Sequence, residues 1–183
     1  QYITDSEIAA SVLWSAHLFK DIEGKVIADL GCGTGVLGIG ALLLGAKMVL
    51  FIDSDKEALA IAKKNVLKLK SESLPYAASF KMIEQDISKI RVKVDVVIQN
   101  PPFGTKIKHQ DIVFLEKAME TAPVVYSFHK SESKSFLERF ASQKSAKMTH
   151  AWQFRLPLKA TFSFHRRQIH RINASCFRFE KTA

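Results

Sequence analysis

Four consecutive residues, Asn100-Pro101-Pro102-Phe103, could hold a planar amine while a methyl group is transferred to it. Such an amine is a weak nucleophile because its lone pair is delocalised into the ring, so it needs acceptors for its N–H bonds rather than a base. The Asn100 side-chain oxygen and the Pro101 carbonyl are acceptors of this kind. The prolines stiffen the segment, and Phe103 could stack on a base, which is worth on the order of 1–3 kcal/mol. We predict that these four residues are catalytic; the alternative is a proline-rich turn that only ends a strand.

A glycine-rich segment upstream, Asp29-Leu30-Gly31-Cys32-Gly33-Thr34-Gly35, indicates a site for a nucleotide-like cofactor. Its glycines permit a tight turn and close approach of a ligand to the main chain. Asp53 and Asp86 each follow a predicted strand, where a carboxylate can accept hydrogen bonds from ribose hydroxyls or an adenine amine. The pattern D-x-G-x-G-x-G resembles the cofactor loop of S-adenosylmethionine-dependent methyltransferases. The expected cofactor is therefore S-adenosylmethionine, with S-adenosylhomocysteine as the product.

A dinucleotide site is the competing interpretation of the same glycines. Residues Gly33–Gly38 fit the pattern G-x-G-x-x-G, and Asp53 lies 20 residues after Gly33. Two observations count against it: the glycine run begins earlier, at Gly31, and the chain is short for a dehydrogenase that also needs a substrate domain. The predicted cofactor contacts in these segments are Asp29, Gly31, Cys32, Gly33, Thr34, Gly35, Leu37, Asp53, Ser54, Asp86, Ile87 and Asn100.

The pattern of apolar residues predicts alternating strands and helices, and hence an α/β fold. Helices are expected at the Thr4–Glu7 capping box and over residues 35–44, 55–70, 110–122 and 131–144. Strands are expected at 25–30, 48–52, 79–85, 94–99, 124–128, 148–156 and 172–179. Four of these strands are near-continuous apolar runs, which is typical of parallel strands covered on both faces. The prediction is a doubly wound sheet that ends in an antiparallel hairpin.

Size and composition fit one globular domain over residues 1–183. Of the 183 residues, 47% are hydrophobic and 25% are charged. No apolar run reaches membrane-spanning length, and no signal-peptide pattern is present. Cys32 and Cys176 lie far apart and suggest neither a disulfide framework nor a metal site, and Cys32 is better explained by its small size than by reactivity. We expect no membrane partner, no metal and a cytoplasmic location.

The charge is concentrated in the C-terminal third of the chain. Residues 1–126 hold 15 basic and 15 acidic residues, whereas residues 127–183 hold 12 basic and 3 acidic residues and so carry the whole net charge of +9. This asymmetry favours a polyanionic partner, nucleic acid first, over a basic face that only aids solubility. The residues predicted to contact RNA are Lys106, His129, Lys130, Arg166, Arg167 and Arg171.

Several segments occur together in an order and spacing that resemble one enzyme family. They are residues 1–4, 29–35, 100–106 and 126–131, with Phe164-His165-Arg166-Arg167 near the end. Over nearly its whole length the chain resembles the methyltransferase-like family that makes N6-methyladenosine in small-subunit ribosomal RNA. The resemblance implies a seven-stranded Rossmann-like sheet with a reversed last strand, in which Gln1, Tyr2 and Thr4 close over the cofactor. In eukaryotic members a small zinc-binding activator protein is a partner at a strand edge, which makes such a protein a candidate partner here.

Other functions share the Asn-Pro-Pro-aromatic signature. Related enzymes act on guanine N2 in ribosomal RNA or on DNA adenine, and versions with Tyr methylate a glutamine amide in release factors. Phe103 and the basic C-terminal third favour a nucleic-acid target, whereas only the wider resemblance points to adenine in RNA. An RNA-binding or ribosome-assembly module that keeps a cofactor pocket is the non-enzymatic alternative.

Overall fold

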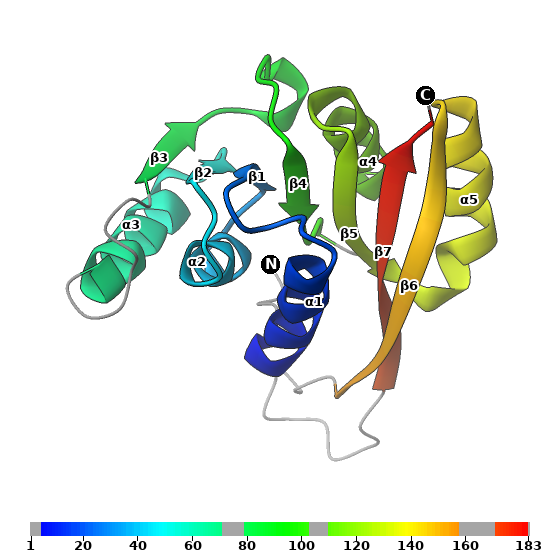
Figure 1. Ribbon diagram of the computed structural model, residues 1–183, viewed down its shortest axis with the longest axis horizontal. Coiled ribbons are helices and arrows are strands. Elements are labelled where there is room, and N and C mark those ends of the chain that lie inside the picture. Colours follow the sequence, from blue (N-terminus) through cyan, green and yellow to red (C-terminus); the bar gives the residue numbers. More distant parts are fainter. Residues whose placement is uncertain (1–4, 71–78, 103–109, 158–170, 183) are drawn as a thin grey trace, which may run out of the picture.

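A computed structural model describes residues 5–70, 79–102, 110–157 and 171–182 of the chain. Within these residues, seven strands form one sheet in the order β3-β2-β1-β4-β5-β7-β6 (Figure 1). The strands are β1 Val26–Leu30, β2 Met48–Asp53, β3 Ser79–Glu84, β4 Val96–Gln99, β5 Val124–Lys130, β6 Ala146–Pro157 and β7 Arg171–Lys181. Strands β1 to β5 pair in parallel, and β7 runs antiparallel to both of its neighbours. The predicted doubly wound sheet with a reversed last strand is confirmed.

The reversed strand lies inside the sheet rather than at its edge. β7 is paired with β5 on one side and with β6 on the other, so β6 is the outer strand. The predicted antiparallel hairpin is confirmed, with pairs that run from Ala146↔Lys181 to Pro157↔Arg171. Both hairpin strands are longer than predicted because the pairing continues beyond the apolar residues on which the prediction rested.

Helices cover both faces of the sheet. On one face lie α1 (Ser6–Leu18), α2 (Val36–Leu43) and α3 (Lys56–Lys70); on the other lie α4 (Gln110–Thr121) and α5 (Lys134–Gln143) (Figure 1). Two hydrophobic clusters fill the space between helices and sheet, one on each face. The central strands are therefore buried on both sides, as their apolar runs indicated. None of the helices in the described residues is long and apolar enough to cross a bilayer.

Two predicted helix starts were wrong. The first helix is capped by Asp5, whose carboxylate accepts hydrogen bonds from the N–H groups of Glu7 and Ile8, because aspartate is as good an N-cap as threonine and lies directly before Ser6. Thr4 lies outside the described residues. The helix predicted over 131–144 is divided into a short 3₁₀ turn, Ser131–Ser133, and α5.

Replacing Gly38 by alanine is expected to destabilise the fold, although alanine usually stabilises a helix interior by about 0.5–1 kcal/mol relative to glycine. A Cβ at Gly38 would overlap the Phe51 ring and lie 3.0 Å from Asp29 Oδ2, and overpacking of this kind costs about 1–3 kcal/mol. Urea unfolding measures the free energy of unfolding of each variant. Gly40→Ala in the same helix is the matched control, because its Cβ would meet only the flexible end of Leu13. Equal stability of the two variants would contradict the expectation.

Candidate active site

Two loops that the sequence singled out lie side by side at the carboxyl edge of the sheet. Strands β1 and β4 pair in parallel, with Leu30 opposite Gln99. The glycine turn begins directly after Leu30, and Asn100 follows directly after Gln99. Ligands of doubly wound sheets bind at this edge, beside the strand where the order reverses. The fold therefore brings the predicted cofactor turn and the predicted catalytic segment to one place.

The glycine turn is fixed to the end of β2. The N–H groups of Gly31 and Cys32 donate to the Ile52 carbonyl at 2.8 and 3.1 Å, and the Gly33 N–H donates to Asp53 Oδ2 at 2.8 Å. Gly31 has φ +66°, and a Cβ there would lie 2.8 Å from the Phe114 ring. Position 31 therefore needs glycine for both its conformation and its packing against α4.

Asp29 is buried beneath this turn and supports the start of α2. Its side chain accepts a hydrogen bond from the Gly38 N–H at 2.8 Å, whereas the N-cap residue, Gly35, has no side chain to do so. Asp29 therefore satisfies one of the N–H groups that a helix start leaves without a partner. Burial raises the pKa of Asp29 to about 7, against the opposing effect of the Gly38 hydrogen bond and with a further rise from Asp53.

Asp53 ends β2 with both carboxylate oxygens directed at the main chain. Oδ2 accepts from Gly33 and Oδ1 accepts from the Asp55 N–H at 2.9 Å, and the residue is 8% exposed. Each carboxylate oxygen has two lone-pair sites, so Asp53 retains acceptor capacity for ribose hydroxyls while it holds the turn. The neighbouring Ser54 is exposed.

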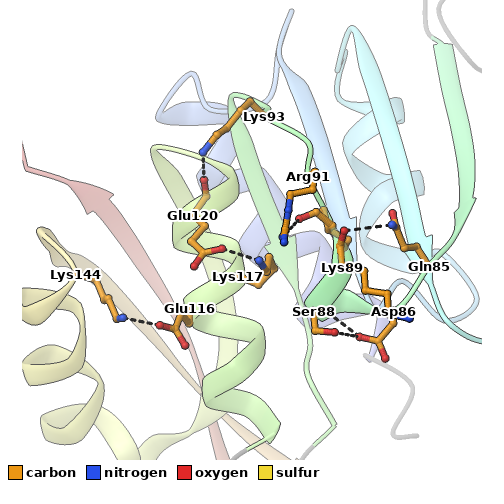
Figure 2. Close-up of polar contacts among 11 residues, drawn as sticks. Gln85, Asp86, Ser88, Lys89, Arg91, Lys93, Glu116, Lys117, Glu120 and Lys144 are labelled. Atoms are coloured by element: carbon orange, nitrogen blue, oxygen red, sulfur yellow. Dashed lines mark hydrogen bonds and ion pairs between the residues drawn. The ribbon is translucent and has the colours of Figure 1, made fainter.

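Asp86 follows β3 and begins the short 3₁₀ turn Ile87–Lys89. Figure 2 shows its carboxylate facing Ser88, whose hydroxyl and N–H donate to Oδ1 at 2.6 and 2.8 Å. These hydrogen bonds hold the pKa of the exposed Asp86 carboxyl below its usual value. Ile87 is half-buried and packs against the hydrophobic cluster on the α4 side. A charged acceptor therefore stands near the end of the third strand, as predicted.

Other predicted cofactor contacts are mainly core residues. Leu37 is 4% exposed within the cluster beneath α1 and α2, which leaves little of its side chain for a ligand. Cys32 is also buried, and burial raises its thiol pKa well above the usual value, in line with a packing role rather than reactivity. Thr34 is half-buried, and its carbonyl accepts a hydrogen bond from Asn65 Nδ2 at 3.1 Å.

The structure describes the predicted catalytic segment as far as Pro102. Asn100 and Pro102 are half-buried and Pro101 is buried, and the side-chain oxygen of Asn100 lies on the buried side of that residue. The remaining predicted site residues that lie outside the described ranges are Phe103, Gln1, Tyr2, Thr4, Lys106, Arg166 and Arg167. Arg171 is the first residue of β7. No group of metal-ligating side chains occurs in the described ranges.

One predicted RNA contact is placed where RNA cannot reach it. His129 is 0% exposed, because it lies on the face of β5 that α4 covers, against Phe177 and Asp111. The prediction that His129 grips a phosphate is therefore not supported by this structure. The side chain of the next residue, Lys130, is 48% exposed, and its Nζ lies 3.7 Å from Glu132 Oε1. This ammonium group is therefore accessible to a phosphate.

The sequence interpretation missed three polar residues beside this site. Gln99, Ser127 and Asp111 form a hydrogen-bonded chain with His129 that runs from the end of β4 to the first turn of α4. One signal was present, because Gln99 interrupts an apolar run directly before Asn100. A second required the strand predicted over 124–128 to continue to His129, as β5 does, which places Ser127 and His129 on one face.

Comparisons with known proteins agree with this geometry. Residues 6–125 match the model of the methyltransferase small domain family. The chain is 36% identical to the rRNA N(6)-adenosine-methyltransferase METTL5 of Danio rerio, covering 100% of this chain and 88% of that protein. It is 34% identical to Mettl5 of Drosophila melanogaster, covering 98% and 85%.

Solved structures of methyltransferases share the fold of this chain. The crystal structure of PH1948 from Pyrococcus horikoshii has a TM-score of 0.85 and 42% identity, covering 100% of this chain and 88% of that one. Magnesium protoporphyrin IX methyltransferase of Synechocystis, solved with bound S-adenosylmethionine, shares the fold at a TM-score of 0.71 and 13% identity, covering 97% and 79%. The fold is that of an S-adenosylmethionine-dependent methyltransferase. The chain belongs to the methyltransferase small domain family.

Replacing Asp29 by asparagine tests the buried carboxylate. Asparagine can still accept the Gly38 hydrogen bond but carries no charge. Because the folded-state pKa of Asp29 is raised from 3.8 to about 7, its protonated form favours folding, and this contribution is lost as pH rises through about 7. Relative to Asp29→Asn, wild type is expected to lose stability between about pH 4 and pH 7, that is, between the unfolded-state and folded-state pKa values of Asp29, as measured by urea unfolding without cofactor. A difference that does not change with pH would contradict this.

Proposed function

We propose that this enzyme transfers a methyl group from S-adenosylmethionine to the N6 amine of adenine in small-subunit ribosomal RNA. The observation that carries the proposal is the position of Asn100 and Pro101, which follow β4 directly beside the glycine turn after β1. The names of the METTL5 relatives support adenine N6 in ribosomal RNA, and the family resemblance supports the small subunit.

The described residues fit the cofactor by their chemistry. The carboxylates of Asp53 and Asp86, at the ends of β2 and β3, suit ribose hydroxyls and an adenine amine. Asp29 is buried with a raised pKa, so a cation in the turn would favour its charged form. S-adenosylmethionine carries a sulfonium and an ammonium group, and when bound it supplies the electrophilic methyl group.

The enzyme's own contribution to methyl transfer is the placement of the amine. The Asn100 side-chain oxygen and the Pro101 carbonyl would each accept a hydrogen bond from one N–H group of the amine. These two hydrogen bonds would turn the nitrogen lone pair out of conjugation and toward the methyl group. Phe103 stacks on the base. The nitrogen would form a C–N bond to the methyl carbon as the C–S bond breaks, S-adenosylhomocysteine would leave, and the proton lost from the methylated amine would pass to water. Holding both reactants in this geometry supplies much of the rate enhancement.

RNA is the proposed partner of the basic C-terminal third, through Lys106, Lys130, Arg166, Arg167 and Arg171. These side chains would bind backbone phosphates, which position a nucleic acid without reading its sequence. A zinc-binding activator protein stays a prediction from the family resemblance.

The identity of the product decides the proposal. Incubation with methyl-labelled S-adenosylmethionine and ribosomal RNA, followed by digestion to nucleosides, is expected to place the label in N6-methyladenosine. Label in N2-methylguanosine would replace adenine by guanine as the target. Label found only in protein would remove the RNA assignment.

Asn100→Ala separates an enzyme from a binding module. We expect turnover to fall by roughly 100-fold or more, because the acceptor acts mainly as the methyl group moves. The affinity for S-adenosylhomocysteine measured by calorimetry is expected to change much less, because Asn100 is only one of many predicted cofactor contacts. Unaltered turnover would overturn the role of Asn100. Full function of this variant in cells would instead favour the RNA-assembly alternative.

Reversing the charge at Arg166 and Arg167 tests the basic segment. The Arg166→Glu/Arg167→Glu variant is expected to bind RNA more weakly. In a plot of the logarithm of the binding constant against the logarithm of the salt concentration, the slope is expected to decrease in magnitude by about 1 for each phosphate that the variant no longer binds. Binding titrations at several salt concentrations measure both quantities. A slope equal to that of wild type would show that neither arginine binds a phosphate.

A further inference from the structure

Four polar side chains form a buried chain next to the catalytic segment. Gln99 Nε2 donates to Ser127 Oγ at 2.9 Å, and Ser127 Oγ lies 2.7 Å from His129 Nε2. His129 Nδ1 lies 3.3 Å from Asp111 Oδ2. Gln99, Ser127 and His129 are each 0% exposed. The chain connects β4, β5 and α4 through side chains.

One arrangement of protons satisfies all of these hydrogen bonds. The Asp111 carboxylate can only accept, so the neutral His129 ring carries its proton on Nδ1. Nε2 then accepts from the Ser127 hydroxyl, and Ser127 Oγ accepts from Gln99. Each donor therefore points from Gln99 toward Asp111, and the charge on Asp111 sets the orientation of the Gln99 amide at the other end of the chain.

This chain of hydrogen bonds links the end of β4, which precedes the catalytic segment, to the start of α4, which follows it. Gln99 directly precedes Asn100, and Asp111 lies in the first turn of α4, the helix that follows the loop. We propose that Ser127, His129 and Asp111 are positioning residues that fix Gln99 and thereby hold Asn100 and Pro101 where they accept hydrogen bonds from the target amine. This inference rests on the proposed use of Asn100 but not on which base carries the amine.

The cost of this arrangement points to a role beyond packing. A buried polar group is unfavourable unless it is hydrogen-bonded, and similarly sized apolar residues fill such sites at no such cost. Moreover, the orientation that Ser127 imposes leaves Gln99 Oε1 buried without a hydrogen-bond partner among the described residues. The chain therefore fixes one orientation of Gln99 even though one of its polar atoms is left unsatisfied.

The protonation state of His129 follows from its surroundings. Asp111 on α4 is the charged group that acts on it within the described residues, while β5 presents Ser127 and β7 presents the Phe177 ring. Burial lowers the pKa of His129, and Asp111 partly opposes this. Protonation at acid pH would turn Nε2 into a donor, which reverses the Ser127 hydrogen bond. Turnover is therefore expected to fall on the acid side as His129 becomes charged.

Removal and restoration of the Ser127 hydroxyl test the proposal in the full-length protein. With cofactor saturating, Ser127→Ala is expected to lower kcat about tenfold, the size of one buried hydrogen bond, while KM for S-adenosylmethionine and affinity for S-adenosylhomocysteine change less than about twofold. Ser127→Thr restores the hydroxyl and is expected to recover most of kcat. Ser142→Ala, which removes an exposed hydroxyl that bonds to its own helix, is the matched control.

The pH profile separates positioning from a merely structural role. Asp111→Asn removes the charge that opposes the lowering of the His129 pKa, so the acid limb of kcat is expected to move to lower pH. Glu116→Gln is the control on the same helix, because Glu116 pairs with Lys144 on the surface (Figure 2), and it is expected to leave the limb in place. Saturating cofactor keeps the titration of Asp29 from entering the comparison.

Three results would overturn the proposal. They are a wild-type kcat in Ser127→Ala, a loss confined to cofactor affinity, and an acid limb in Asp111→Asn that coincides with that of Glu116→Gln. If Ser127→Ala does not fold, Ser127→Thr and Asp111→Asn decide. Nucleoside digestion of the wild-type product is a separate measurement, so an error in the proposed base and an error in the positioning chain would be distinguished.

Discussion

The candidate site depends on one constraint, the parallel pairing of β4 with β1. Because Leu30 lies opposite Gln99, the glycine turn and Asn100 leave the sheet at the same edge and next to each other. Both strands are buried on both faces, so neither can slip by one residue without moving apolar side chains out of the two clusters. The hydrophobic core therefore sets the separation between the cofactor turn and the amine-holding segment.

Three carboxylates hold this edge of the sheet together through hydrogen bonds. Asp53 holds the Gly33 N–H, Asp29 holds the start of α2, and Asp111 holds His129. Asp53 and Asp29 accept hydrogen bonds from main-chain N–H groups in the segment that is proposed to bind the cofactor. The same two side chains would therefore both support the turn and interact with the ligand. Asp29 also carries a raised pKa, which is typical of functional sites as well as of buried structural carboxylates.

A buried ion pair joins the antiparallel hairpin to the segment between α1 and β1. Arg178 on β7 donates to Asp21 at 2.9 Å, the Tyr126 hydroxyl donates to the same carboxylate at 2.7 Å, and the guanidinium lies over the Phe19 and Tyr126 rings. Arg178 is one of the 12 basic residues in the C-terminal third, yet it is only 8% exposed and is already paired. A count of charge along the sequence thus overstates the surface that could meet a polyanion.

Local patterns in the sequence identified the helices, the strands and the two loops, although not the start of every helix or the length of every strand. Apolar runs identified the parallel strands, and the types of Asp53, Asp86 and Asn100 identified acceptors at strand ends, because these signals lie within a few neighbouring residues. Only the tertiary structure decided that β7 enters between β5 and β6, that Leu37 is core, and that His129 is buried in a chain from Gln99 to Asp111. These outcomes depend on contacts between segments far apart in sequence: whether a polar residue faces solvent or a partner is set by the strand and helix that pack against it.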